Sequence, residues 1–206
     1  MPAHRYCRPR QQTLGIPATR ASNGRAAWSD RLNEDILPLQ RLHLSNLLEA
    51  IQRCAWFLKA AEENVPWPLN ANILDARKKD KLLFGSLSAI NERFAKLQYT
   101  LGAAMRHATL LVSEPTESFL QVLAFYEKID VLESTAQWQR CRLARNLAAH
   151  AYETDYTSIA DHFNTLHALS VFLFVVAARF AAWCREALNI EPSSRDFADA
   201  LPDSIA

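Results

Sequence analysis

Three side chains suited to proton transfer and phosphate binding lie close together in the second half of this 206-residue chain. Arg145, His150 and Tyr152 place a guanidinium, an imidazole and a phenol within eight consecutive residues, and Arg142 and Asn146 lie beside them. A guanidinium keeps its charge and can bind a phosphate through two parallel hydrogen bonds. An imidazole titrates near neutral pH, so it can give or take a proton. The combination is suited to cleaving a phosphodiester bond.

Residues 138–156 predict a helix with these polar side chains on one side. At about 100° per residue, Arg145 and His150 lie about 140° apart, so they flank a cleft without touching each other. The small side chains of Ala148 and Ala149 leave room for another backbone to approach. The packing side is predicted to hold five apolar residues: Leu143, Ala144, Leu147, Ala148 and Ala151.

A purely structural interpretation of the same residues is also available. Arg145 would be a solvated helix residue, and His150 a cation that interacts favourably with the negative end of the helix dipole. Tyr152 would belong to the core, with its hydroxyl group hydrogen-bonded. Spacing alone favours this interpretation over a catalytic one.

The residues around Arg145 resemble the signature of the HEPN domain family. The chain reads R-N-x-x-A-H-x-Y at residues 145–152, preceded by Trp138 and by a second arginine, Arg142. More closely, it resembles the HepT-like toxins, which are encoded beside a minimal nucleotidyltransferase antitoxin. The resemblance extends back through residues 118–146 and to residues 93–102. Many relatives read H-E-Y-P where this chain reads H-A-Y-E.

The resemblance implies a metal-independent endoribonuclease toxin whose substrate, RNA, supplies the nucleophile as its 2′-hydroxyl group. His150 would deprotonate that hydroxyl or protonate the leaving oxygen. Arg145 would bind the scissile phosphate and stabilise the charge of the transition state. Asn146 would orient His150 or the phosphate, and Arg142 would hold the flanking RNA backbone. No metal and no cofactor is expected.

The resemblance also implies two protein partners. One is a second copy of the chain, since an isologous two-fold contact near the motif helix would bring both copies of Arg145 and His150 to one cleft. The other is the nucleotidyltransferase antitoxin, which would silence the toxin by transferring adenylate groups to Tyr152. Tyr156 is the nearest substitute acceptor.

A noncatalytic HEPN module that holds the nucleotidyltransferase or its substrate is the alternative function. Charge favours it slightly, because five of the 23 basic residues lie in residues 1–29, which leaves 18 basic against 22 acidic residues from Asp30 onward. Such a balance does not provide the broad basic face of a nonspecific nucleic-acid-binding protein. Three arginines and no acidic residue lie between Glu133 and Glu153, however, so positive charge is concentrated beside the motif.

The rest of the chain predicts an all-α, mostly antiparallel bundle of about five helices. A disordered basic arm (residues 1–29) is expected to precede the bundle (30–192), and a flexible tail (193–206) to follow it. Ser134 with Gln137, and Ser158 with Asp161, have the spacing of capping boxes that open helices. Apolar periodicity and breaking residues predict helices at residues 37–63, 79–111, 119–128 and 158–189, in addition to the motif helix that Ser134 opens.

Residues 158–189 contain the longest apolar run of the chain. His167, Ser170 and Arg179 interrupt it, so a buried bundle helix is favoured over a membrane span. The four cysteines are widely separated and show neither C-x-x-C spacing nor paired histidines, which indicates no zinc site and no disulfide framework. Free thiols and the absence of a secretory signal pattern predict a cytoplasmic protein.

Overall fold

The computed structural model describes residues 21–148 and 155–201, and the side chains of residues 36–146 and 155–201. The chain divides into two compact units, Met1–Leu39 and Gln40–Ala206. In the first unit the described residues belong to a helix that begins at Ala21. Residues 21–29 are therefore helical, whereas the sequence predicted a disordered arm there. The apolar periodicity used for that prediction begins only near residue 37, so it could not detect the earlier helical turns.

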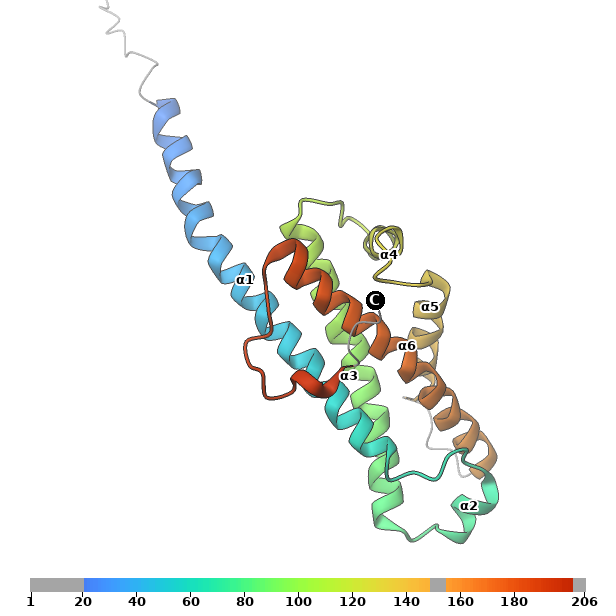
Figure 1. The fold of residues 1–206 in the computed structure, drawn as a ribbon. Helices are drawn as coiled ribbons and strands as arrows, with labels where there is room; N and C mark the ends of the chain where they lie inside the picture. Colours follow the sequence, from blue (N-terminus) through green and yellow to red (C-terminus); the bar gives the residue numbers. More distant parts are fainter. Residues whose placement is uncertain (1–20, 149–154, 202–206) are drawn as a thin grey trace, which may run out of the picture. The chain divides into compact units, whose positions relative to one another are not determined.

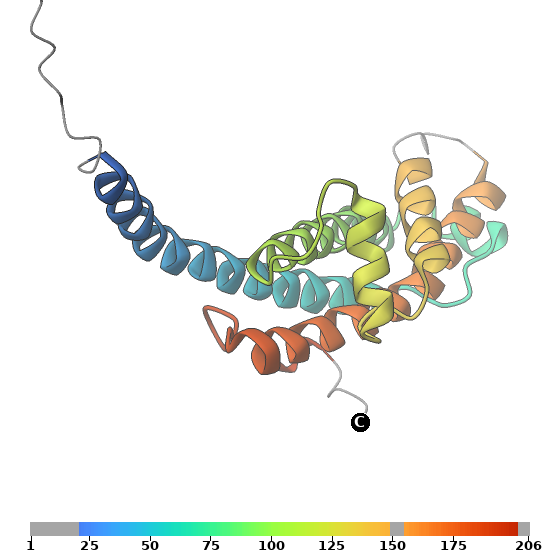
Figure 2. The same ribbon diagram turned by 90° about the horizontal axis from the view of Figure 1, so that it is seen from above.

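The described chain is all-helical and contains no strand, which confirms the predicted all-α class (Figures 1 and 2). It has six α-helices where about five were expected, because the connection after residue 63 contains a short additional helix. The elements are α1 (Ala21–Glu62), α2 (Ala71–Ala76), α3 (Lys81–Leu111), α4 (Phe119–Lys128), α5 (Thr135–Ala148), α6 (Tyr156–Leu188) and a 3₁₀-helix, η1 (Ala198–Ala200).

Side-chain caps begin most of the helices in the second unit. The Asp80 carboxylate accepts hydrogen bonds from two backbone N–H groups of the first turn of α3, and Ser118 forms a capping box with Gln121 at α4. Asp155 caps α6 by accepting from the N–H groups of Thr157 and Ser158. The predicted capping box of Ser158 with Asp161 is therefore wrong, because the carboxylate three residues before Ser158 occupies the N-cap position.

Helices α3 and α6 form the centre of the second unit, and α6 also packs against α2 and α5. Phe94 and Leu101 of α3 and Phe180 of α6 are fully buried, as is Tyr126 of α4. The Tyr126 hydroxyl donates a hydrogen bond of 3.0 Å to the Met105 carbonyl, and its burial raises the pKa of this phenol far above its ordinary value. The core is thus built from the apolar faces that the sequence pattern assigned to α3 and α6.

Helix α6 is long and apolar enough to cross a membrane by length and composition alone. Half of its most apolar window is buried within the chain. The buried side chains include Leu166, Leu173, Val176 and Phe180, which contribute to the same core as α3. This packing accounts for the apolar run as the interior helix of a bundle.

Residues 193–201 pack against α1 instead of forming the flexible tail that the sequence predicted. The Ser193 N–H donates to the Ser45 carbonyl at 3.2 Å, and the Ser193 hydroxyl donates to Glu49 at 2.7 Å. Phe197 contacts Trp56 with ring centroids 6.2 Å apart, and Ala200 is buried. The structured part of the second unit therefore continues beyond residue 192. The few side chains that hold this segment in place are too widely spaced in the sequence to form a helical or strand pattern.

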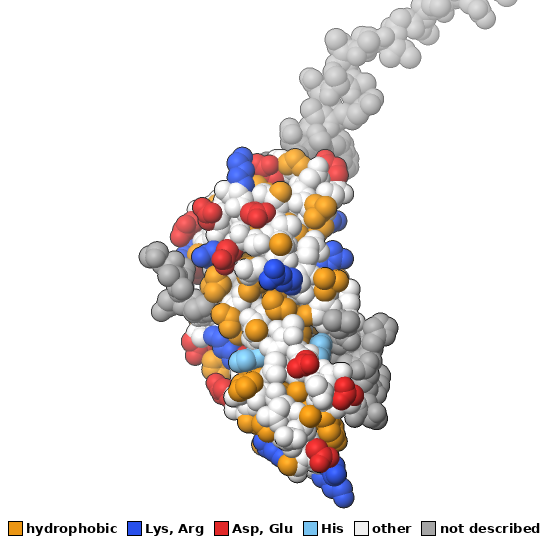
Figure 3. All heavy atoms as spheres, turned by 90° about the vertical axis from the view of Figure 1, so that its right-hand side faces the viewer, with side chains coloured by type: hydrophobic (Ala, Val, Ile, Leu, Met, Phe, Trp, Pro, Cys, Tyr) orange, Lys and Arg blue, Asp and Glu red, His pale blue; other side chains and the backbone are white. Residues whose placement is uncertain are grey.

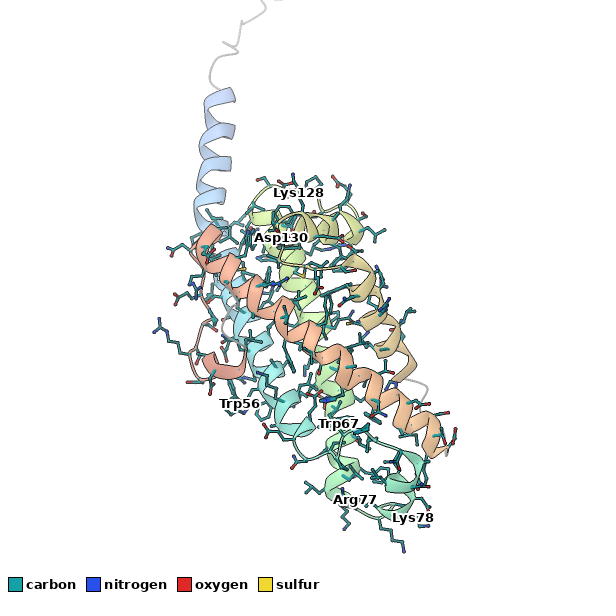
Figure 4. The ribbon with its side chains drawn as sticks, turned by 45° about the vertical axis from the view of Figure 1, so that its right-hand side comes forward. Trp56, Trp67, Arg77, Lys78, Lys128 and Asp130 are labelled. Carbon is teal, nitrogen blue, oxygen red and sulfur yellow. The ribbon has the colours of Figure 1, made fainter. Side chains whose placement is uncertain are left out.

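A buried acidic side chain closes the end of the core near the connection between α1 and α2. Glu62 is 8% exposed, and its Oε1 lies 3.2 Å from Nδ1 of His167. Trp67, labelled in Figure 4, stacks on the His167 ring at 4.1 Å and donates its indole N–H to the Glu62 carbonyl. Burial raises the pKa of the Glu62 carboxyl above its ordinary value, although the nearby Ser170 hydroxyl and His167 ring oppose this shift.

Replacing Glu62 by glutamine is expected to stabilise the folded chain at neutral pH. Above the ordinary carboxyl pKa of 4.5 the folded state holds the Glu62 proton more tightly than the unfolded state, so stability falls as pH rises through that range. Glutamine removes the titrating group and keeps its shape. Urea denaturation between pH 4 and pH 8 should show a flatter pH dependence for E62Q. Exposed Glu63 provides the matched control, and an E62Q protein that is less stable than wild type at neutral pH would contradict the expectation.

Candidate functional site

Helix α5 carries the first part of the sequence motif and is anchored by a buried face. Its start is held by Ser134, whose hydroxyl accepts from the Gln137 N–H at 3.3 Å. Trp138, Cys141 and Ala144 are buried at 1%, 0% and 4% exposure. This face differs from the predicted one by about one residue, because the core that receives it lies on the Trp138 side. Leu143, expected to pack, is 64% exposed.

The structure describes the first part of the motif but not its last part. Arg142 and Asn146 are exposed and Arg145 is partly buried, all on the described part of α5. His150 and Tyr152, the expected proton-transfer and modification residues, lie outside the described residues. The distance between Arg145 and His150 therefore stays a prediction from spacing.

Arg142 and Arg145 open onto a groove of about 340 Å³ between α3 and α5. The groove also contains Arg106 of α3, which the sequence analysis did not single out. The guanidinium of Arg106 lies 5.7 Å from the ring centre of Phe119, the first residue of α4. No sequence spacing connects Arg106 with Arg142, since the two are brought together only when α3 packs against α5. Figures 1 and 2 show the backbones of α3, α4 and α5, which contact one another.

The three arginines of the groove make no ion pair with a carboxylate in the described part of the chain. Arg145 contacts the side-chain oxygen of Asn146 through Nε at 3.4 Å and Nη2 at 3.3 Å. Arg142 contacts Gln139 at 3.4 Å. Amide groups thus orient these guanidinium groups without neutralising them, so their positive charge is available to an anion. Asn146 contacts Arg145 here, a contact that the sequence analysis did not assign.

The floor of the groove contains polar atoms that lack hydrogen-bond partners in the described chain. Gln98 is 2% exposed, and both its amide oxygen and its amide nitrogen are unpartnered. The indole N–H of Trp138 is also buried and unpartnered. Buried polar groups are normally hydrogen-bonded, because leaving one unpaired costs about 1–3 kcal/mol. Gln98 and Trp138 line the same groove as the three arginines.

Gly102 lets the aromatic floor of the groove come close to α3. A Cβ atom at this position would lie 3.2 Å from Cζ of Phe119 and 3.3 Å from Cζ2 of Trp138. Most real Cβ contacts are longer, so a larger residue would push these rings outwards. Tertiary packing therefore favours a small residue here, although it lies in the middle of a helix, where glycine is unfavourable.

Two glycine replacements in α3 should separate these effects. G85A is expected to raise the free energy of unfolding by about 0.5–1 kcal/mol through helix propensity, since nothing lies within 4 Å of its Cβ. G102A should raise the free energy of unfolding by at least about 0.5 kcal/mol less than G85A does, because Phe119 and Trp138 must move to admit the new methyl group. Urea denaturation of both variants measures the difference. Equal stabilisation by G85A and G102A would mean that the rings of Phe119 and Trp138 can shift at no cost in free energy.

The other histidines of the described chain have structural contacts. Nε2 of His107 lies 2.9 Å from the Gln40 carbonyl, and His43 packs edge-on against the same ring. Burial lowers the pKa of His162, which favours its neutral form. Among residues 21–148 and 155–201, no group of three histidine, cysteine or acidic side chains is arranged to hold a metal ion.

Comparison of the chain with protein-family models, with curated proteins and with solved structures finds no match.

Proposed function

We propose that this chain is a metal-independent endoribonuclease of the HEPN type that cleaves RNA at the groove between α3 and α5. The observation that carries the proposal is the convergence of Arg106, Arg142 and Arg145, free of carboxylate partners in the described chain, on one groove beside the motif helix. Three guanidinium groups that line one groove can bind the phosphates of a nucleic-acid backbone. The motif that begins on α5 and continues beyond the described residues contains His150, which is proposed as the group for proton transfer.

The reaction proposed is an attack of the ribose 2′-oxygen on the adjacent phosphorus. The O2′–P bond forms as the P–O5′ bond breaks, the 2′-hydroxyl proton passes to a base, and the leaving 5′-oxygen takes up a proton. His150 carries one of these proton transfers. Arg145 stabilises the charge on the phosphoryl oxygens, while Arg142 and Arg106 bind neighbouring phosphates. The products are a 2′,3′-cyclic phosphate and a 5′-hydroxyl end.

Charge on the chain fits local binding of RNA better than sliding along it. On the face drawn in Figure 3, acidic and basic side chains are interspersed with apolar ones, and no broad basic area is visible there. From Asp30 onward, 22 acidic residues exceed 18 basic ones. Productive binding therefore depends on the arginine groove, and it should weaken steeply as salt screens these few contacts.

A cleavage assay in excess chelator tests the proposal. End-labelled RNA incubated with the full chain should yield fragments with 2′,3′-cyclic phosphate and 5′-hydroxyl ends, and H150A should abolish their formation. Undiminished cleavage by both H150A and R145A would show that a contaminating nuclease or a different site acts.

The alternative proposal is a noncatalytic module that binds a nucleotidyltransferase or its substrate. The acidic excess from Asp30 onward favours it. The same assay separates the two functions, because a binding module would retain RNA or its protein partner without producing any new RNA ends.

We further propose that Tyr152 is the site at which a partner nucleotidyltransferase silences the enzyme. An adenylate on this phenol would add negative charge and a nucleoside next to the motif. Coexpression with the adjacent nucleotidyltransferase should raise the intact mass by multiples of adenylate in wild type but not in Y152F. Tyr156, partly buried in the first turn of α6, is the control tyrosine. A mass increase retained in Y152F and lost in Y156F would assign the modification to Tyr156.

The proposed active form is a homodimer. A two-fold contact near α5 would place two motifs in one cleft, so that each copy could supply one of the two proton transfers. Light scattering at micromolar concentration should give twice the monomer mass, and a strictly monomeric yet active chain would exclude the composite site.

A further inference from the structure

The arginine groove between α3 and α5 also contains an exposed aromatic side chain. Tyr99 of α3 lines this groove together with Arg106, Arg142 and Arg145. It is 70% exposed, the highest value among the exposed large hydrophobic side chains of the described chain. An exposed tyrosine ring presents a flat apolar face. The groove therefore offers an accessible aromatic surface as well as positive charge.

Tyr99 contributes little to the packing of the described chain. It belongs neither to the hydrophobic core nor to the partly buried side chains that pack against this core. Its ring forms no aromatic pair with any described residue. Tyrosine is also a poorer helix former than alanine or leucine. Stability of the fold thus gives no reason for a tyrosine at this position, and its ring is open to contact with a ligand.

Helical spacing places Tyr99 and Arg106 on the same side of α3. They are seven residues apart, which is about two helical turns and about 10 Å along the helix axis. The groove lining between them is small, because Gly102 has no side chain and Ala103 has only a methyl group. An aromatic ring and a guanidinium group thus flank a low stretch of α3, and the facing helix α5 contributes two further arginines.

This combination has the composition of surfaces that bind single-stranded nucleic acid. Such surfaces bind successive phosphates through positive side chains and stack the bases on aromatic rings. Within a duplex, neighbouring base pairs cover both faces of each base, so a protein ring can stack only on an unpaired base. An exposed tyrosine beside arginines therefore distinguishes a single strand from a duplex, which arginines alone do not.

We propose that Tyr99 is a base-stacking residue of the ribonuclease groove, with its ring against an unpaired base of the RNA and Arg106 on a phosphate of the same strand. This role rests on the proposed function, since it uses the same groove. Tyr99 is a substrate-binding residue that takes no part in the proton transfers. It makes productive binding depend on an unpaired nucleotide beside the arginines.

Fluorescence anisotropy with RNA that cannot be cleaved tests the proposal. The probe is a labelled strand of mixed sequence, about 12 nucleotides long, whose 2′-O-methyl riboses lack the attacking hydroxyl. It is used alone and annealed to its complement. Y99A should bind the single strand about tenfold or more weakly than wild type, and the two proteins should bind the duplex equally. Y99F and Y99W should keep the wild-type affinity, whereas Y99L, which is apolar but not aromatic, should lose it.

L82A is the matched control, because Leu82 is 63% exposed on the same helix but does not line the groove. It should bind the single strand like wild type. Because Tyr99 is exposed, Y99A should retain the helical circular dichroism of wild type. With cleavable RNA, Y99A should raise KM and leave kcat unchanged, since the stacked base is held equally in the bound state and in the transition state.

Three binding results would overturn the proposal. They are equal binding of the single strand by wild type and Y99A, wild-type affinity in Y99L, or equal weakening of single-strand and duplex binding in Y99A. Conversion of a dimer to a monomer by Y99A, measured by light scattering, would instead assign Tyr99 to a contact between copies.

The same measurements separate this role from the ribonuclease activity. RNA cleavage by a Y99A chain that also binds the single strand like wild type would overturn the role of Tyr99 and leave the ribonuclease standing. Single-strand binding that depends on Tyr99, without any cleavage of ordinary RNA, would do the reverse.

Discussion

Replacement of Arg145 by alanine is expected to lower kcat/KM for RNA cleavage by about 10²–10³-fold, the loss seen when one charge-stabilising donor is removed from an active site. Arg145 is partly buried, its guanidinium is oriented by Asn146, and it opens onto the groove with Arg106 and Arg142. In the proposed reaction this positive charge would lie against the scissile phosphate. R145K should recover only part of the loss, because an ammonium group cannot form the two parallel hydrogen bonds of a guanidinium.

Variants of two other arginines serve as comparisons for R145A. R140Q is the matched control, because Arg140 is on the same helix but lines a different groove, facing α6. Its activity should stay within about twofold of wild type, the range of a screened surface charge. R106Q should raise KM more than it lowers kcat, since Arg106 is assigned to a neighbouring phosphate. The assignment of Arg145 would be wrong if R140Q and R145A lost activity equally, or if R145A cleaved RNA like wild type.

Replacement of Trp138 by alanine is expected to lower the free energy of unfolding by about 3–5 kcal/mol. The side chain is 1% exposed and is among the largest fully buried side chains of the described chain. Its ring packs 6.0 Å from the Phe119 ring and against Gly102, so its removal leaves a cavity where α3, α4 and α5 meet. The same change should loosen the groove that holds Arg142 and Arg145.

Urea denaturation of W138A and W56A measures this effect with a control of the same residue type. Trp56 is 40% exposed at the surface covered by the C-terminal segment, and Figure 4 labels it there. W56A should lower the free energy of unfolding by less than half as much as W138A, because a smaller apolar area loses its contacts. Similar losses in the two variants would show that the α5 interface is not a principal part of the core.

The sequence by itself determined the helical character of the chain and most helix positions. Apolar residues at helical spacing mark α3 and α6 within about two residues of their observed ends, since a helix that is buried along one stripe or all round must repeat apolar side chains at that spacing. It also identified Arg142, Arg145 and Asn146 as chemically capable residues, because residue type and local order are properties of the sequence. His150 and Tyr152 belong to the same motif, and their arrangement stays a prediction.

Only the tertiary structure decided which distant residues share a site. Arg106 joins Arg142 and Arg145 because α3 packs against α5, and residues 193–201 lie along α1 because Ser193 bonds to Ser45 and Glu49. The exposure of Leu143 follows from the same cause, since the register of α5 on the core is set by the large buried ring of Trp138. Periodicity tells which residues of one helix face the same way. It does not tell which helix lies opposite, because that choice depends on side-chain volumes summed over the whole core.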